Sequence, residues 1–196
     1  MVNYSHHSDD ELIAMFIVGD AMAMETLFHR YKKSVYSWLL RTTADVSESE
    51  DLYHEIWLKV ISRSEKYKPG NFKAWLWQIV HNTTIDRLRK RSPLLVLDEP
   101  VDADDESGQT VLNQLSDDTA VNALMQIEEK ERKEIICRAI EELPPVHREV
   151  VLLRINGELS FKEISELLTV PLGTVLARMH HAVNNLKEIL LKKGVG

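Results

Sequence analysis

The segment Asn71–Arg91 (NFKAWLWQIVHNTTIDRLRKR) carries side chains that suit the binding of single-stranded nucleic acid. Trp77 lies in its first third and Asn82 near its middle. Four cations crowd its end: Arg87, Arg89, Lys90 and Arg91. Aromatic rings stack on bases, amides bind base edges, and cations bind phosphates. The segment therefore predicts a nucleic-acid-binding element, with an amphipathic core helix as the simpler interpretation.

Histidine is the other residue type that could do chemistry. The eight histidines are His6, His7, His29, His54, His81, His147, His180 and His181. None stands in an HExxH arrangement, and the chain has no glycine-rich phosphate loop. The run from His6 to Asp9 could catch a metal ion, but a frayed terminus explains it more simply. We therefore expect a protein that is not an enzyme, with no catalytic residue, no metal and no cofactor.

Helical periodicity accounts for the first part of the chain, where apolar residues recur three or four positions apart. Four helices are predicted there, at residues 9–18, 20–42, 47–64 and 71–91. Asp20 and Asn71 are expected to be N-caps, and Ser47 to Glu50 has the spacing of a capping box. The loop at residues 65–70 contains Pro and Gly, which end the third helix.

Acidic residues concentrate in the middle of the chain. Of the formal net charge of −7, residues 93–130 contribute −9, whereas the segments before and after contribute +1 each. Ser92-Pro93 ends the preceding helix. The stretch from Leu94 to about Asn122 is poor in aromatic residues and lacks sustained periodicity. It is predicted to be a linker that is mostly unfolded when alone.

A helix-turn-helix pattern is predicted after the linker. Helices are expected at residues 131–143, 146–156, 160–168 and 172–191. The last two form the motif, in which the second helix enters the major groove. Its predicted exposed residues are Thr174, Leu176, Arg178, His180, His181, Asn184, Asn185 and Lys187. Only two of these are permanently cationic, so a weak grip on duplex DNA is expected.

The composition places the chain among globular cytoplasmic proteins. Its 196 residues are enough for one domain or two small ones. Charged residues interrupt every apolar run before bilayer-spanning length, and the N-terminus lacks the pattern of a secretory signal. The one cysteine, Cys137, cannot form an internal disulfide, which fits a reducing compartment.

Two motif blocks follow one another along the chain. The first block is EDLYHEIWLKV followed by FKAWLWQIVHNTTIDRLRKR. The second, after the acidic linker, is IEELPPVHREVVLLRINGELSFKEISELLTVPLGTVLARMHHA. In this order the two blocks resemble a bacterial RNA polymerase sigma factor of the extracytoplasmic-function class, and the resemblance extends from about Asp9 to Leu190. It implies an all-helical protein of two domains, a four-helix domain and a C-terminal helix-turn-helix domain, joined by a flexible linker.

The resemblance also implies contacts for the first block. The helix at Glu50–Val60 matches the family's polymerase-binding helix, which packs on a coiled coil of the β′ subunit. Candidate contacts are Asp51, Glu55, Trp57 and Leu58. The family usually has Gln where this chain has His54. Asn82 matches a position that often receives a flipped-out base of the minus-ten element.

The cations at the end of the same segment match positions that contact the DNA backbone: Arg87, Arg89, Lys90 and Arg91. Trp77 is expected to face solvent or DNA, whereas Trp75 and Leu76 are expected in the core.

The second block matches the part of the family that reads the minus-thirty-five element. Its candidate DNA contacts are Ser160, Thr174, Arg178, His180 and His181. The family usually has several more cations here, of which this chain retains Arg178, so weaker or altered duplex binding is expected. The histidines could make that binding pH-dependent.

The resemblance further implies partners: polymerase core through its β′ coiled coil and β flap, promoter DNA, and an anti-sigma factor. The linker of the family runs toward the RNA exit channel of the polymerase. Acidic residues of this linker could mimic a polyanion there: Asp98, Glu99, Asp102, Asp104, Asp105 and Glu106. An overall negative charge would keep the free protein off DNA.

Two other functions remain open from the sequence. One is a helix-turn-helix regulator that binds duplex DNA without polymerase, which would need a symmetric dimer and a basic recognition surface. The other is an interaction protein that binds polymerase or an anti-sigma factor without starting transcription. The main interpretation is a cytoplasmic sigma factor with a polymerase-binding and minus-ten domain at 1–92, a linker at 93–127 and a minus-thirty-five domain at 128–196.

Overall fold

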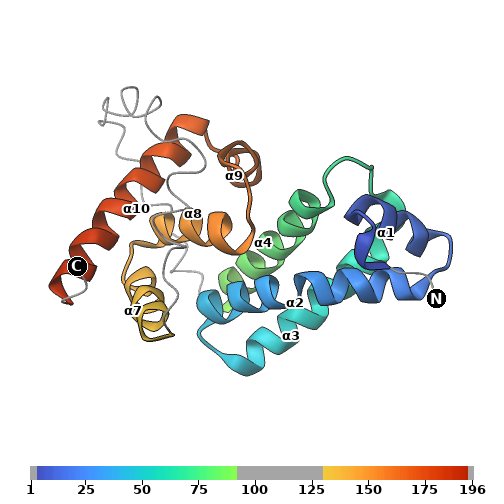
Figure 1. The fold of residues 1–196 in the computed structure, drawn as a ribbon, viewed down its shortest axis with the longest axis horizontal. Coiled ribbons are helices and arrows are strands. Elements are labelled where there is room, and N and C mark those ends of the chain that lie inside the picture. Colours follow the sequence, from blue (N-terminus) through green and yellow to red (C-terminus); the bar gives the residue numbers. More distant parts are fainter. Residues whose placement is uncertain (1–3, 92–129, 194–196) are drawn as a thin grey trace. The chain divides into compact units, whose positions relative to one another are not determined.

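The computed structural model describes residues 4–91 and 130–193, which fall into two compact units, Met1–Glu99 and Pro100–Gly196. Within these described ranges every regular element is a helix, as predicted (Figure 1). None of the described helices is long and apolar enough to cross a bilayer. The predicted acidic linker lies outside the described residues.

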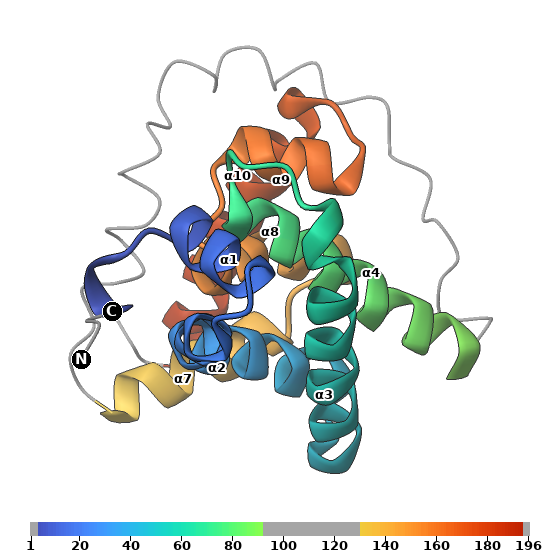
Figure 2. The ribbon, with the colours of Figure 1, turned by 90° about the vertical axis from the view of Figure 1, so that its right-hand side faces the viewer.

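The N-terminal unit is built around one long helix. Its elements are η1 (Tyr4–His6), α1 (Asp9–Ile17), α2 (Ala21–Thr43), α3 (Val46–Arg63), η2 (Ser64–Lys66) and α4 (Phe72–Arg91). Helix α2 packs against α1, α3 and α4, and α3 also packs against α4 (Figures 1 and 2). Helix α4 also contacts α1, so it has three helical neighbours and its buried sector is correspondingly wide.

Side-chain caps fix where these helices begin. Asp20 accepts from the N–H of Met22 at 3.1 Å, and Asn71 accepts from the N–H of Ala74 at 3.0 Å, so both predicted caps are confirmed. The predicted capping box that begins at Ser47 is wrong. Asp45 caps α3 instead, accepting from the N–H of Glu48 at 2.9 Å, because the helix starts earlier than expected.

Aromatic side chains fill much of this core. Trp38 of α2 and Trp77 of α4 meet edge to face, with ring centroids 5.6 Å apart and an interplanar angle of 84°. A second cluster joins Phe28 of α2 to Tyr53 and Trp57 of α3, with centroid distances of 5.2 and 5.0 Å. Edge-to-face and tilted pairs are the favoured ring geometries, so these contacts help to fix how the three helices cross.

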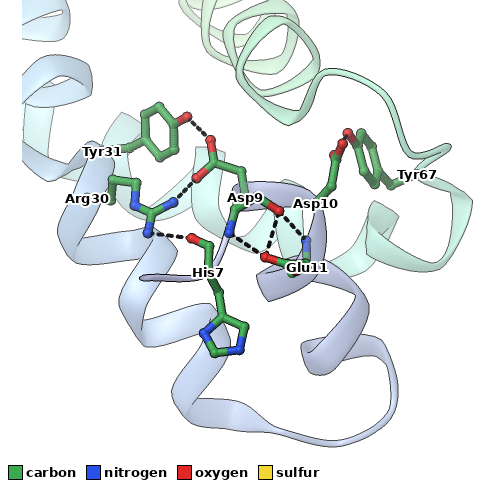
Figure 3. A network of polar contacts seen from close by, with 8 residues as sticks. His7, Asp9, Asp10, Glu11, Arg30, Tyr31 and Tyr67 are labelled. Carbon is green, nitrogen blue, oxygen red and sulfur yellow. Dashed lines mark hydrogen bonds and ion pairs between the residues drawn. The ribbon is translucent and has the colours of Figure 1, made fainter. Parts of the chain in front are cut away.

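The first turn of α1 ties the unit together through polar contacts (Figure 3). Asp9 accepts hydrogen bonds from Arg30 and Tyr31 of α2. Asp10 accepts from the Tyr67 hydroxyl and from the N–H of Gly70, both in the loop that leads into α4. A short helix with few buried residues is thus anchored to two other parts of the unit.

The C-terminal unit has a helix-turn-helix at its end. Its described elements are α7 (Lys130–Glu141), α8 (Pro145–Asn156), α9 (Phe161–Leu168) and α10 (Leu172–Lys192). Helix α10 packs against the other three. Thr169 ends α9 in the left-handed region at φ 57°, and the Ser165 hydroxyl donates to the carbonyl of Val170 at 2.7 Å. These two features shape the turn between α9 and α10.

Candidate nucleic-acid interface

The polar run Asn82–Thr84 lies in the middle of α4 and offers one side chain to solvent. Asn82 is exposed, and its Oδ1 lies 3.4 Å from Nδ1 of His81. The next two residues, Thr83 and Thr84, are buried, and the Thr84 hydroxyl donates to the carbonyl of Val80 at 2.8 Å. Asn82 is therefore the residue of this polar run that can reach a base.

The prediction that Trp77 faces solvent or DNA is wrong. Its side chain is 0% exposed and packs against Trp38. The reason is the wide buried sector of α4, which takes in Trp77 as well as Leu76 because α2 and α3 cover adjoining faces. Trp75, expected in the core, is instead half-buried against Tyr67 and Phe72, with centroids 5.0 and 5.6 Å away.

Ion pairs with α3 engage the basic end of α4. Arg87 Nη2 lies 2.7 Å from Glu55 Oε2, and Arg91 Nη1 lies 2.6 Å from Glu48 Oε2. Arg89 and Lys90 are exposed. Glu55 also pairs with Lys59 at 2.8 Å. Lys59, and after it Arg87, hold the pKa of Glu55 below its usual range against the opposing effect of burial, so the carboxylate stays charged.

The outer face of α3 combines acidic and apolar side chains. Asp51 and His54 are exposed, Leu58 is 66% exposed, and Ile61 is 44% exposed. Sequence reasoning missed Ile61, although its spacing of three from Leu58 puts both on one face. Trp57 is 4% exposed within the aromatic cluster, so its predicted place on the contact surface is wrong.

The candidate residues of the recognition helix α10 are only partly exposed. Thr174, Arg178, His180 and His181 are all half-buried. Leu176, which was expected to be exposed, is 7% exposed, so that prediction is wrong. The helix packs against three neighbours, and its buried stripe is wider than its sequence pattern indicated.

A stacked histidine pair links α8 to α10. The rings of His147 and His181 lie 5.8 Å apart with an interplanar angle of 14°. Burial, and then the nearby His181 and Arg178, lower the pKa of His147. The contact between the two rings could not be predicted from the sequence, because His147 and His181 belong to different helices that meet only in the folded protein.

Ser160 has a structural task. Its hydroxyl accepts from the N–H of Glu163 at 3.3 Å, and the Glu163 carboxylate accepts from the N–H of Ser160 at 2.6 Å. This capping box starts α9, the first helix of the motif.

Among the described residues no group of three or more His, Cys, Asp or Glu side chains could hold a metal ion.

Family models match both units. The model described as Sigma-70 region 2 matches residues 27–93, and the one described as Sigma-70, region 4 matches residues 133–186. The first match includes α3, α4 and the loop between them, and the second includes the helix-turn-helix.

Several curated relatives match over almost their full length. The ECF RNA polymerase sigma factor SigW of Bacillus subtilis (strain 168) is 31% identical over 175 residues, covering 88% of this chain and 91% of the relative. The RNA polymerase sigma factor CarQ of Myxococcus xanthus is 30% identical over 173 residues, covering 88% and 91%. SigM of Bacillus subtilis (strain 168) is 26% identical over 174 residues, covering 89% and 98%.

Solved structures share the fold at lower identity. CnrH, solved in complex with the cytosolic domain of CnrY, aligns with a TM-score of 0.63 and 17% identity over 93% of this chain and 96% of that one. The sigma factor RpoE from Bartonella quintana, solved with the anti-sigma factor NepR, aligns with a TM-score of 0.60 and 18% identity over 85% and 95%.

Proposed function

The chain belongs to the extracytoplasmic-function RNA polymerase sigma factors, and we propose that it brings core polymerase to particular promoters through the surfaces described above. The observation that carries this proposal is the pairing, within one unit, of the acidic and apolar outer face of α3 with the polar middle and basic end of α4. Such a unit can bind a protein with one helix and a DNA strand with the other.

The polymerase contact in this proposal is the outer face of α3. Asp51, Leu58 and Ile61 are exposed on it, and Glu55 lies at its edge. Exposed apolar side chains bordered by charges are typical of a protein-binding surface. The β′ coiled coil of the polymerase is the partner that the family resemblance implies.

The minus-ten contact in this proposal is α4. Asn82 would hold an unpaired base through its amide, since both of its polar groups can bond to base edges. Arg87, Arg89, Lys90 and Arg91 would bind phosphates of the separated strand. No covalent chemistry is needed, because binding to the open strand favours strand separation, and we therefore assign no enzyme activity.

The minus-thirty-five contact falls to α9 and α10 in the second unit. Ser160, Thr174, Arg178, His180 and His181 are the proposed contacts, and Arg178 is the one permanent cation among them. With so few cations the unit would bind duplex DNA weakly by itself. Polymerase core, through its β flap, would then be needed to keep it on the promoter.

The remaining assignments follow from family membership. We propose a domain division at 1–92, 93–127 and 128–196, with the acidic middle segment as the linker. The protein would act in the cytoplasm, where the polymerase is, and an anti-sigma factor would hold it inactive.

The test is reconstitution with core polymerase from the source bacterium. The protein should co-purify with core and start transcription from a promoter that core alone does not use. Leu58→Glu should weaken core association, because it places a charge on the apolar part of the α3 face. Val18→Glu is the matched control, since Val18 is even more exposed but lies at the end of α1. Core association without transcription would favour the interaction protein, and tight, specific duplex binding without core would favour the regulator.

A further inference from the structure

Two arginines at the basic end of α4 are each in contact with a carboxylate of α3. The Arg87 pair is half-exposed on both sides, with 38% of each side chain accessible. The Arg91 pair is less symmetric, because the Glu48 side chain is 14% exposed and that of Arg91 is 59% exposed. Glu48 was not among the predicted binding residues.

Further contacts hold Glu55 in place. Lys59, one turn along α3, lies 2.8 Å from Glu55 Oε1, while Arg87 engages Oε2. Lys59 Nζ also donates to the Thr83 hydroxyl of α4 at 3.1 Å. Both carboxylate oxygens of Glu55 are therefore used, one by its own helix and one by α4.

These contacts compete with nucleic acid. A guanidinium binds a phosphate best when its N–H groups are available as a fork, and a carboxylate competes for the same groups. Glu48 and Glu55 also place negative charge beside the path of an incoming phosphate. Exposed ion pairs are individually weak, so a strong competitor can displace them.

The two proposed partners meet at Glu55. It borders the α3 face that we assign to polymerase, and it binds an arginine that we assign to DNA. A polymerase cation that engages Glu55 would leave Arg87 available for a phosphate. Linkage then requires that polymerase raises the affinity for DNA and that DNA raises the affinity for polymerase by the same factor.

We propose that Glu48 and Glu55 are positioning residues for DNA binding: they hold Arg91 and Arg87 against α3 in the free protein and release them to phosphates when polymerase binds the α3 face. This inference rests on the proposed function for its second half. Its first half, the masking of two arginines by two glutamates, concerns the free chain alone and can be tested without polymerase.

The first experiment measures binding of a labelled single-stranded oligothymidine to the full chain at low salt. Glu48→Gln and Glu55→Gln are compared with Glu50→Gln, an exposed residue of α3 that makes the same change in net charge. We expect the first two to bind several-fold tighter than the control. The log–log salt slope should steepen by about 0.7 for each arginine released. Affinities equal to that of Glu50→Gln would overturn the masking.

A double-mutant cycle assigns the effect to the ion pair. In an Arg87→Ala background, Glu55→Gln should bind no tighter than Glu50→Gln in the same background, because the arginine to be released is gone. A gain that persists without Arg87 would overturn the pairing. Circular dichroism of each variant checks that the helices are intact, so that a gain in affinity is read on folded protein.

The second experiment adds core polymerase and measures affinity for the same strand. Core should raise the affinity of the natural chain for the strand by some factor. It should raise the affinity of the Glu55→Gln variant by a smaller factor, because Arg87 is already released in that variant. Equal factors would overturn the coupling and leave the masking in place. If core does not bind the chain at all, the proposed function is wrong. The strand affinities of the glutamate variants in the free protein still test the masking independently.

Discussion

Asp10 of α1 accepts a hydrogen bond from the hydroxyl of Tyr67, 57 residues further along the chain, and a second from the N–H of Gly70 at 3.1 Å. Burial, and then the carboxylate of Asp10, raise the pKa of Tyr67. Tyr67 in turn packs against Phe72 and Trp75 in the first turns of α4. The start of α1 therefore holds the loop that leads into the proposed DNA-binding helix.

Removing this anchor should weaken the whole N-terminal unit. Asp10→Ala leaves the Tyr67 hydroxyl and the Gly70 N–H without their acceptor, which should lower the free energy of unfolding by about 1–3 kcal/mol. All four tryptophans lie in this unit, so their fluorescence during urea unfolding follows it directly. Glu50→Gln, on an exposed part of α3, should leave the midpoint unchanged. An unchanged midpoint for Asp10→Ala would show that the anchor contributes nothing.

Local features of the fold could be predicted from the sequence, because they depend on residues close together in the chain. The caps at Asp20 and Asn71 are of this kind, since each bonds to a backbone N–H two or three residues ahead. The predicted capping box at Ser47 was wrong because a better N-cap, Asp45, lies two residues before it. Competition between neighbouring cap residues is not resolved by a spacing rule alone.

Burial and pairing between helices could not be predicted in the same way. Trp77 and Leu176 are buried because their helices have several neighbours, which the period of one helix does not reveal. The pairing of Glu55 with Arg87 joins two residues 32 positions apart, each of which the resemblance had assigned to a different partner. The Glu55–Arg87 contact could be identified only from the structure, which shows how α3 and α4 cross.

Tyr53 should make the N-terminal unit sensitive to alkaline pH. Its hydroxyl is buried without a hydrogen-bond partner among the described residues, and burial raises its pKa to about 12, although the adjacent Trp57 indole offsets part of this effect. The folded state thus keeps its proton where the unfolded chain, with a pKa near 10.0, loses it. Stability is fully present below about pH 10 and is lost as the pH rises toward the folded value.

Tyr53→Phe tests this dependence. The variant should be as stable as the natural protein or slightly more stable near neutral pH, because it removes a buried hydroxyl that has no partner in the described part of the chain. Between about pH 9 and about pH 11 its stability should fall less steeply, with Tyr67 accounting for part of the remaining slope. Urea unfolding followed by tryptophan fluorescence measures both. Identical pH slopes for the two proteins would contradict the assignment.

Asn82 should matter for initiation and not for polymerase binding. Asn82→Ala removes the amide that we assign to an unpaired base, and transcription from the protein's own promoter should fall roughly tenfold, the usual cost of a lost base contact. Its side chain is exposed, so folding and core association should not change. Gln78→Ala, also exposed and one turn earlier on α4, is the control. Equal transcription from both variants would remove Asn82 from the interface.

The His147–His181 stack should destabilise the C-terminal unit in mild acid. Within residues 4–91 and 130–193 no group hydrogen-bonds to the buried Nδ1 of His147, and burial together with His181 and Arg178 lowers the pKa of His147 from its usual 6.5. Protons then bind the unfolded chain more readily than the folded one. Stability is therefore present above about pH 6.5 and is lost as the pH falls through the lower value of the folded state.

His147→Phe isolates this effect, because it keeps a flat ring against His181 and removes the group that titrates. Between about pH 7.5 and about pH 5.5 the natural protein should lose stability in the C-terminal unit, and the variant should lose less. The unit has no tryptophan or tyrosine, so its unfolding is followed by circular dichroism. The imidazole proton resonances measure the pKa directly, and a value for His147 at or above 6.5 would contradict the burial that lowers it.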